Sequence, residues 1–338
     1  MGGDGGPELV VAATRRFLDD NQDVDITLYG VRDKVLVHFP QGDSNAIPRC
    51  RIEHSSQTVE DDELPSAALR HKQNSSMGLA FQAVAEGRAS ACVSSGNTGA
   101  MVAMGLKLMG CHEGVDRPAI CATIPARSKS CYLLDVGANV DCSAAQLRQL
   151  AAMATAMVSA LEGSARPTVA LLNIGKESIK GNRVVKEAAE LFAGDASLNY
   201  LGFIEADELL DGRVDIFVCD GFVGNIALKA SEGAVRNVMG RIALIAERHM
   251  SQNELHLNGD ARQAVDDFSS SLVKGLGQTL DPDIYNGAIL LGLRGVAIKS
   301  HGNTGEMGFY RALEQAARAA EADVPALVSR QINRSVSR

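Results

Sequence analysis

The chain has 338 residues, enough for one large domain or two medium-sized ones with a packed core. Its composition, 46% hydrophobic and 22% charged, is typical of a globular protein, and no segment reaches the ~20 uninterrupted apolar residues of a membrane span. The net charge of −8 argues against a broad nucleic-acid-binding surface, although a local basic patch stays compatible with it.

The seven cysteines are spread along the chain without any C-x-x-C pair. We therefore expect reduced, mostly buried thiols in a cytoplasmic protein and no metal site. The first residues have neither the basic cluster nor the apolar core of a secretory signal.

The chain opens with a glycine loop, Gly2–Pro7, followed by apolar residues at helical spacing from Leu9 to Leu18 and by a strand, Asp25–Gly30. Such a loop normally follows a strand, so we expect that a preceding strand is missing from this sequence. Residues 31–65 predict no element.

A strand, Ala91–Ser94, leads into Ser95-Gly96-Asn97-Thr98-Gly99-Ala100 and then into a helix, Met101–Met109. A strand, a glycine loop and a helix N-terminus together suit phosphate, because backbone N–H groups and the helix dipole face the anion. The pattern is neither a dinucleotide fingerprint nor a P-loop, so alone it is a weak signal.

Two similar junctions follow. The strand Tyr132–Val136 turns at Gly137-Ala138-Asn139 into the helix Ala144–Leu161. The strand Thr168–Leu172 runs into the loop 173–182, which contains Lys176 and Lys180, and then into a helix at 184–192. Either lysine could meet a phosphate oxygen, or both could be ordinary solvated charges.

A fourth junction joins the strand Asp215–Cys219 to a helix that we expect from Ile226 onward. Between them lies Asp220-Gly221-Phe222-Val223-Gly224-Asn225, which could hold an anion or be an ordinary capped turn. With a further strand at Tyr200–Ile204, the alternation predicts an α/β fold with a doubly wound, mostly parallel sheet. We expect the glycine loops to gather at one edge of that sheet.

Apolar and basic residues alternate at helical spacing over about 236–275, which predicts a projecting amphipathic helical hairpin. The apolar stripe of this hairpin must be buried against something, and we expect a second subunit first, the protein's own core second and a membrane surface third. After a turn and an apolar segment at 280–292, we expect a strand at Val296–Ile298 and a helix at Tyr310–Glu321. We expect residues 1–330 to form one catalytic domain, with fraying from Ser329 and a flexible tail at 331–338.

Seven motifs occur in a fixed order along nearly the whole chain. They are Asp4 after Met1-Gly2-Gly3, Ser95–Ala100, Arg117-Pro118, Asp135–Asn139, Asn173-Ile174-Gly175 with Lys180-Gly181-Asn182, Asp220–Asn225, and Gly287-Ala288 with Ser300-His301-Gly302. In this order they closely resemble the bacterial phosphate acyltransferases of the PlsX family.

The resemblance implies an isopropylmalate-dehydrogenase-like fold, a homodimer, and a cytoplasmic enzyme loosely associated with the inner face of the membrane. It implies transfer of an acyl group from acyl carrier protein to orthophosphate, which gives an acyl phosphate for phospholipid synthesis, without cofactor or metal. A membrane glycerol-3-phosphate acyltransferase would then be a functional partner.

By resemblance, Lys180 is expected to bind phosphate or developing charge, and Asn225 to orient the carbonyl or oxyanion. We expect the remaining phosphate- and substrate-binding residues to be Asp4, Ser95, Gly96, Asn97, Thr98, Gly99, Asp135, Asn139, Asn173, Asp220, Gly224 and His301.

Two other functions stay open. A phosphotransacetylase acting on acyl-CoA would use the same loops. A non-catalytic membrane-bound scaffold would keep the hairpin without the chemistry. A dehydrogenase is less compatible with the sequence, because no G-x-G-x-x-G with a ribose-binding acid is present.

Overall fold

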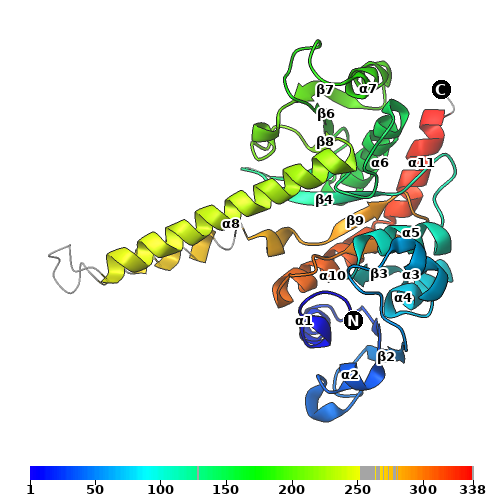
Figure 1. Ribbon diagram of the computed structural model, residues 1–338, viewed down its shortest axis with the longest axis vertical. Helices are drawn as coiled ribbons and strands as arrows, with labels where there is room; N and C mark the ends of the chain where they lie inside the picture. The colour runs from blue at the N-terminus through cyan, green and yellow to red at the C-terminus, as the bar shows by residue number, and fades with distance from the viewer. Residues whose placement is uncertain are drawn as a thin grey trace.

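The computed structural model describes residues 1–127, 129–251 and 281–336, and between the last two ranges residues 263, 267–268, 270–272, 274–276 and 279. Figure 1 shows an elongated body from which one long helix, α8 (Gly221–Ser251), projects sideways. The two ends of the body carry different elements, with α7 (Arg183–Gly194) at one end and α2 (Arg32–Leu36) at the other.

An eight-stranded sheet forms the centre of the body. Its strands are short and rich in apolar residues, and most of them are buried on both faces, as expected for a sheet covered on both sides. In spatial order they are β3 (Ala91–Ser94), β10 (Val296–Lys299), β9 (Ala288–Leu291), β4 (Ala119–Pro125), β5 (Ser130–Leu134), β8 (Ile216–Val218), β6 (Thr168–Leu172) and β7 (Asn199–Ile204).

The sheet is mixed and mostly parallel. β3 pairs with β10 in parallel, and β5, β8, β6 and β7 form a second parallel group. Between the groups lie three antiparallel pairings, β10 with β9, β9 with β4 and β4 with β5. Because three reversals separate them, the two parallel groups run in opposite directions.

The expectation that all the glycine loops leave one edge of the sheet is therefore wrong. The loop after β3 leaves in one direction, and the loops after β5, β8 and β6 leave in the other. The reason is that β4 and β9 were not predicted as strands, and they are the strands that reverse the direction.

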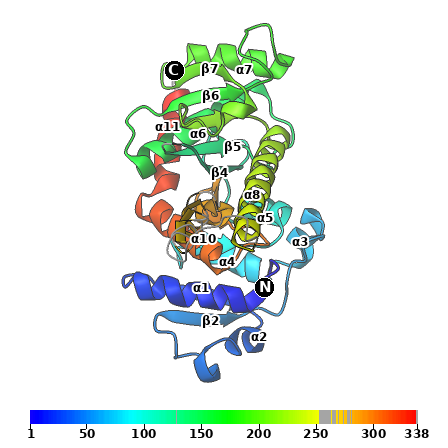
Figure 2. The same cartoon turned by 90° about the vertical axis from the view of Figure 1, so that its left-hand side faces the viewer.

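Helices cover both faces of the sheet, as the doubly wound pattern predicts (Figure 2). Neighbouring residues on a strand point to opposite faces, so Leu134 packs in one core and Leu133 in the other. One face is covered by α7 with α6 (Ala144–Glu162), α10 (Glu306–Glu321) and α11 (Val324–Val336). The other is covered by α3 (Pro65–His71), α4 (Ser76–Ala85), α5 (Thr98–Leu108) and the start of α8.

A smaller layer lies beyond the sheet. It contains α1 (Gly6–Asp20), β1 (Ile26–Gly30), α2 and β2 (Cys50–His54), and α1 packs on α10 through an edge contact between Phe17 and Tyr310. A cavity of about 980 Å³ separates β1 from β3. The sequence predicted β1 but not β2. Three 3-10 helices complete the described elements: η1 (Pro40–Gly42), η2 (Ala206–Glu208) and η3 (Pro282–Tyr285).

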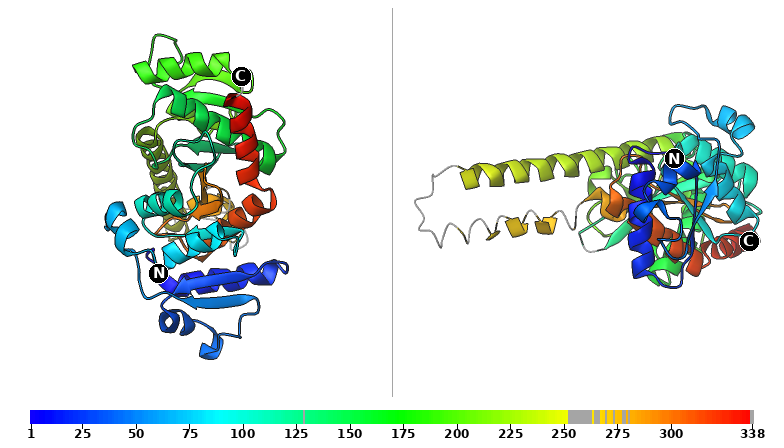
Figure 3. Two further views of the ribbon diagram at one scale, coloured as in Figure 1. Left: turned by 90° about the vertical axis from the view of Figure 1, so that its right-hand side faces the viewer. Right: turned by 90° about the horizontal axis from the view of Figure 1, so that it is seen from below.

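The prediction of a frayed tail from Ser329 is wrong for the residues that the structure describes. Helix α11 continues to Val336 and packs on α6, with Val328 and Ile332 buried (Figure 3, left). These two apolar side chains, four residues apart, give the segment a buried face that its charged composition concealed. Residues 337–338 of the predicted tail lie outside the described residues.

The projecting part of α8 corresponds to the first arm of the predicted hairpin (Figure 3, right). Its side chains Val238, Leu244 and Ile245 are about half exposed. The predicted turn lies outside the described residues, and the described residues from 263 to 279 are helical. Within the described ranges, no helix combines the length and hydropathy needed to cross a membrane.

Candidate functional site

The N-terminus of helix α8 packs directly against the turn that follows β5. The Gly221 N–H donates to the carbonyl of Asn139 at 2.7 Å, and a Cβ on Gly224 would lie 1.9 Å from the carbonyl oxygen of Asp135. Only glycine allows this approach. Asp220 caps the helix by accepting from the Val223 N–H at 2.8 Å. The helix begins at Gly221, five residues before the predicted start at Ile226.

From this start, α8 crosses the sheet face over β5 and β4 and reaches the loop that follows β10. There the Nζ atom of Lys229 lies 3.5 Å from Nδ1 of His301. The helix thus connects loops that leave opposite edges of the sheet. The site forms across the face of the sheet and not along a single edge.

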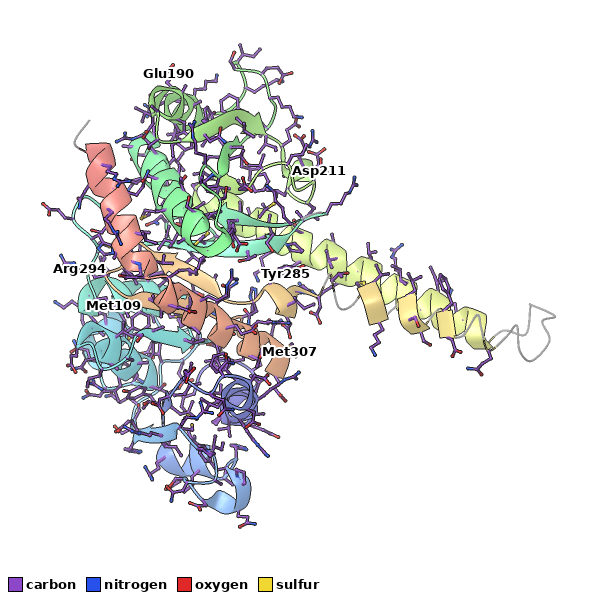
Figure 4. The ribbon with its side chains drawn as sticks, turned by 180° about the vertical axis from the view of Figure 1, so that it is seen from behind. Met109, Glu190, Asp211, Tyr285, Arg294 and Met307 are labelled. Atoms are coloured by element: carbon purple, nitrogen blue, oxygen red, sulfur yellow. The ribbon has the colours of Figure 1, made fainter. Side chains whose placement is uncertain are left out.

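A cavity of about 150 Å³ lies between α8 and the central strands. Its basic side chains, Lys229, Lys299 and His301, lie together in one part of it, the polar end, and Thr98 and Asn225 also line the cavity. Tyr285, which Figure 4 shows near the base of the projecting helix, also lines it. The rest of the wall is largely apolar and includes Ile120, Ala122, Ile124, Pro125, Val136, Leu210, Leu228, Val235 and Ala288.

Lys299 is a partly buried cation at the polar end. Its ammonium group donates to the carbonyls of Ser95 (3.3 Å) and Ser300, and no carboxylate within the described ranges forms an ion pair with it. Burial, together with the nearby charge of Lys229, lowers the pKa of Lys299 to about 8. An incoming anion would therefore find a cation whose charge is not already neutralised.

Three basic side chains surround the carboxylate of Glu232, whose side chain is 11% exposed. Lys229 lies 3.0 Å from it, His301 Nε2 3.2 Å and Arg236 3.8 Å. Burial alone would raise the pKa of Glu232, but its contacts with His301 and Lys229 outweigh burial and lower this pKa to about 2. The carboxylate is thus ionised at any working pH.

Three glycine loops meet beside this polar end. The Asp4 N–H donates to the carbonyl of Gly302 at 2.7 Å, and the Ser95 hydroxyl donates to the carbonyl of Gly2 at 2.7 Å. A Cβ on Gly2 would lie 2.8 Å from Cα of Gly96, so the two loops touch through glycine. The loops that converge here are those at 2–4, 95–99 and 301–302, whereas the loops after β5, β6 and β8, expected at the same edge as 95–99, leave in the other direction. The Asp4 side chain itself is exposed.

Asn97 and Ser95 hold the loops together with their side chains. Asn97 caps α5 by accepting from Ala100 N–H at 2.9 Å, and its amide group donates to the carbonyls of Glu60, Asp61 and Glu63. Both ends of this side chain are thus engaged within the protein. Thr98 and Gly99 follow at the N-terminus of α5, where backbone N–H groups are available to an anion.

Asp135 and Asn139 lie beneath the surface of the site. Asp135 is fully buried and accepts from the N–H groups of Ile120, Gly137, Ala138 and Asn139 and from the Asn139 amide. Burial raises the pKa of Asp135, although these hydrogen bonds oppose that shift. The pair shapes the turn on which α8 starts and does not line the cavity.

Lys180 and Asn173 lie on the loop after β6, and neither lines the cavity. Asn173 donates to the carbonyl of Gly175 at 3.0 Å, and Lys180 is exposed, with its stem against Gly175. Lys176 forms an ion pair with Glu208 at 2.8 Å. The structure therefore brings Asn225, Thr98 and His301 together and leaves Lys180 outside that group.

Three charged residues of this region were not singled out in the sequence: Lys229, Glu232 and Lys299. Lys229, Glu232 and Arg236 follow Asn225 at intervals of four, three and four residues, which places all four on one face of a helix. Lys299 directly precedes the Ser300-His301-Gly302 motif. Both signals were readable, but only with knowledge of where α8 begins and which loop it approaches.

The chemistry of the site is that of cations, amides and hydroxyls. Within the described residues, no three His, Cys, Asp or Glu side chains gather as a metal ion would require. All seven cysteines fall in the described ranges and are free. Burial raises the pKa of Cys219 well above its usual value, which makes it a poor nucleophile.

Comparison with solved structures supports the same fold. A phosphotransacetylase from Streptococcus pyogenes matches with a TM-score of 0.60 at 18% identity, over 94% of this chain and 92% of that one. A branched-chain phosphotransacylase from Enterococcus faecalis V583 matches with a TM-score of 0.59 at 14% identity, over 94% and 97%. At these identities the likeness is one of fold alone.

Comparison of sequences goes further. The model of the family described as "Fatty acid synthesis protein" matches residues 1–327. The phosphate acyltransferase of Legionella pneumophila (strain Paris) is 42% identical over 98% of this chain and 94% of its own length. That of Nitrosococcus oceani is 44% identical over 97% and 94%. The chain therefore belongs to the fatty acid synthesis protein family and is an enzyme of its PlsX-type phosphate acyltransferases.

Proposed function

We propose that the enzyme transfers an acyl group from acyl carrier protein to orthophosphate at the cavity beside α8, and that the acyl phosphate serves glycerol-phosphate acylation. The observation that carries this proposal is that basic side chains cluster at the polar end of the cavity while most of the remaining lining is apolar, with Asn225 among the lining residues. The reaction requires both, because a phosphate must meet a fatty acyl thioester.

In the proposed reaction a phosphate oxygen attacks the thioester carbonyl carbon. The C–S bond then breaks, the tetrahedral oxyanion collapses to the acyl phosphate, and the pantetheine thiolate leaves. No enzyme nucleophile is needed, so catalysis consists of positioning and electrostatic stabilisation. Lys299, Lys229 and the N–H groups at the start of α5 would hold the phosphate, and the Asn225 amide would donate to the oxyanion.

Lys180 stays part of the proposal as a third cation. It lies on the loop after β6, and β6 is the direct neighbour of β8, whose helix carries Asn225. No ion pair engages its side chain within the described ranges. Of the other expected contacts, Gly96 and Gly99 would allow the phosphate to approach the backbone, while Asp220 and Gly224 would set the start of α8.

The acyl chain would lie on the apolar wall formed by β4 and the buried side of α8. Ile120 and Leu228 are nearly inaccessible to solvent and form part of this wall. Arginines farther along α8, such as Arg241, would meet an acidic carrier protein and give an encounter that weakens with salt. Arg241→Glu should then raise the KM for the carrier-bound substrate at low salt.

The proposed assembly is a homodimer in which a second subunit covers the apolar stripe of α8, with peripheral contact to the inner membrane. We also propose that the fold is of the isopropylmalate-dehydrogenase-like type. A membrane glycerol-3-phosphate acyltransferase would consume the product.

Release of free thiol from palmitoyl carrier protein, with and without orthophosphate, tests this function. The proposal predicts release that depends on phosphate and produces one acyl phosphate per thiol. Faster phosphate-dependent release from palmitoyl-CoA than from the carrier protein would favour a phosphotransacetylase instead. Release that ignores phosphate would contradict both.

A further inference from the structure

Glu232 lies at the meeting point of two elements that approach the cavity. It belongs to α8, one turn beyond Lys229, and it contacts His301 on the loop after β10. Both Lys229 and His301 line the cavity, and Glu232 lines it as well. Its carboxylate therefore ties the helix to the loop after β10.

The contacts of His301 favour one tautomer of its ring. Lys229 Nζ lies 3.5 Å from Nδ1 of His301, and because an ammonium group can only donate, this contact is a hydrogen bond in the tautomer whose Nδ1 carries no proton. Nε2 then carries the proton and donates to Glu232 at 3.2 Å. A proton on both ring nitrogens would set an N–H against the ammonium group. The arrangement is coherent only with the carboxylate in place.

The carboxylate also contacts Lys229 directly, so it controls that side chain in two ways. It attracts the Lys229 ammonium at 3.0 Å, and it holds the His301 imidazole, whose Nδ1 contacts the same ammonium. Without Glu232, Lys229, Arg236 and Lys299 would repel one another near the cavity, since each carries a positive charge. Lys229 is about half exposed and would then turn toward solvent.

We propose that Glu232 is a positioning residue for phosphate: it holds the Lys229 ammonium, directly and through His301, where that ammonium can meet the anion. This inference rests on the proposed function, because it takes the cationic end of the cavity as the phosphate site. Glu232 touches no reacting atom and acts only through its two partners. Its removal should therefore change the use of phosphate and leave the binding of the thioester donor unchanged.

A double-mutant cycle tests the inference. The variants are Glu232→Ala, Lys229→Ala and both together, assayed for KM of orthophosphate, KM of the thioester donor and kcat. A charge-assisted hydrogen bond contributes about 1.5–3 kcal/mol, so Lys229→Ala should lower kcat/KM for phosphate roughly 10- to 100-fold. Glu232→Ala alone should cause a loss of the same order, and the double variant should lose no more than Lys229→Ala alone.

Two further variants separate positioning from folding. Glu232→Gln keeps an acceptor for Nε2–H but removes the charge, so it should recover part of the lost activity. Glu314→Ala is the matched control, because Glu314 also forms an ion pair with a cation three residues away, Arg311 at 2.6 Å, on α10. It should leave both KM values unchanged.

The outcomes are distinct. Non-additive losses confined to phosphate, with partial recovery in Glu232→Gln, support the inference. Additive losses, or an equal rise in the KM of the thioester donor, overturn it while leaving the proposed function in place. An unimpaired Lys229→Ala enzyme overturns both the inference and the assignment of phosphate to this end of the cavity. Phosphate-independent thiol release by the wild-type enzyme contradicts the proposed function itself.

Discussion

Two regions of the molecule look alike in the sequence and differ in the structure. The loops at 95–99 and 301–302 and the loops at 135–139 and 173–182 all combine glycines with polar residues after a buried strand. In the first region, Thr98, Lys299 and His301 reach a cavity. In the second, Asp135 accepts five hydrogen bonds from the protein and Lys176 forms an ion pair with Glu208.

The difference teaches that a polar glycine loop signals a tight turn before it signals a ligand. Polar side chains of such a loop that are fully engaged within the protein serve the turn, and only those that reach a cavity can serve a ligand. Asn97 shows this even within the first region. Its amide donates to three carbonyls of the loop at 60–63, whereas the neighbouring Thr98 lines the cavity. The following predictions test this division.

The largest expected effect is on stability and lies in the second region. Asp135→Ala removes the acceptor of five buried hydrogen bonds, so the N–H donors of the turn lose their partner. We expect a fall of about 3–5 kcal/mol in the free energy of unfolding. Urea denaturation measures it. A fall below about 1 kcal/mol, the net contribution of one ordinary hydrogen bond, would show that the turn does not depend on this carboxylate.

The next effect is on catalysis and lies beside the cavity. Asn225→Ala should lower kcat by about 10²–10³, the usual result of removing one oxyanion donor, with the fold intact. Steady-state kinetics and circular dichroism report the two quantities. Asn173→Ala is the control, since that amide bonds within its own loop and should change kcat little. Equal losses in the two variants would remove the distinction between the regions.

A third effect concerns pH. The pKa of Lys299, lowered to about 8 by burial and by the charge of Lys229, means that its charge is present below this pH and lost above it. The KM for orthophosphate should therefore rise by about tenfold per pH unit above 8. Lys299→Met should remove this rise. A KM that keeps the same pH dependence in the variant would assign the dependence to another group.

The smallest effect belongs to the lysine of the second region that already has a partner. Lys176 is 56% exposed in its ion pair with Glu208, and Arg213 also contacts that carboxylate at 2.8 Å. Lys176→Met should cost no more than about 1 kcal/mol of stability, as exposed ion pairs do, and should not change the KM for phosphate. A rise in that KM would bring the loop at 173–182 into the phosphate site and would strengthen the role predicted for Lys180.

The sequence predicted much of the fold because hydrophobic periodicity is a local signal. The strand Ala91–Ser94 and the strand Thr168–Leu172 have the predicted bounds, and α6 differs by one residue at its end. The strands β4 and β9 were missed, and with them the reversal of direction across the sheet. Strand direction depends on pairing between residues far apart in the chain, which no local pattern contains.

The site was predictable in its parts and not in its assembly. Asn225, Thr98 and His301 carry motif signals, and they do share a cavity. Lys229 and Lys299 became visible only when α8 was seen to run from the turn at Asp135–Asn139 to the loop after β10. Conversely, nothing local reveals that Asp135 is fully buried, because its partners include Ile120 from another strand.

Direct binding of orthophosphate tests the central claim, that the cationic end of the cavity beside α8 holds the phosphate. Isothermal titration of the wild-type enzyme, Lys299→Met and the control Lys176→Met at pH 7 compares the relevant cations. The account predicts a Kd for phosphate raised about tenfold or more in Lys299→Met, the effect of losing one charge-assisted hydrogen bond, and unchanged in Lys176→Met. An unchanged Kd in a folded Lys299→Met protein would contradict it.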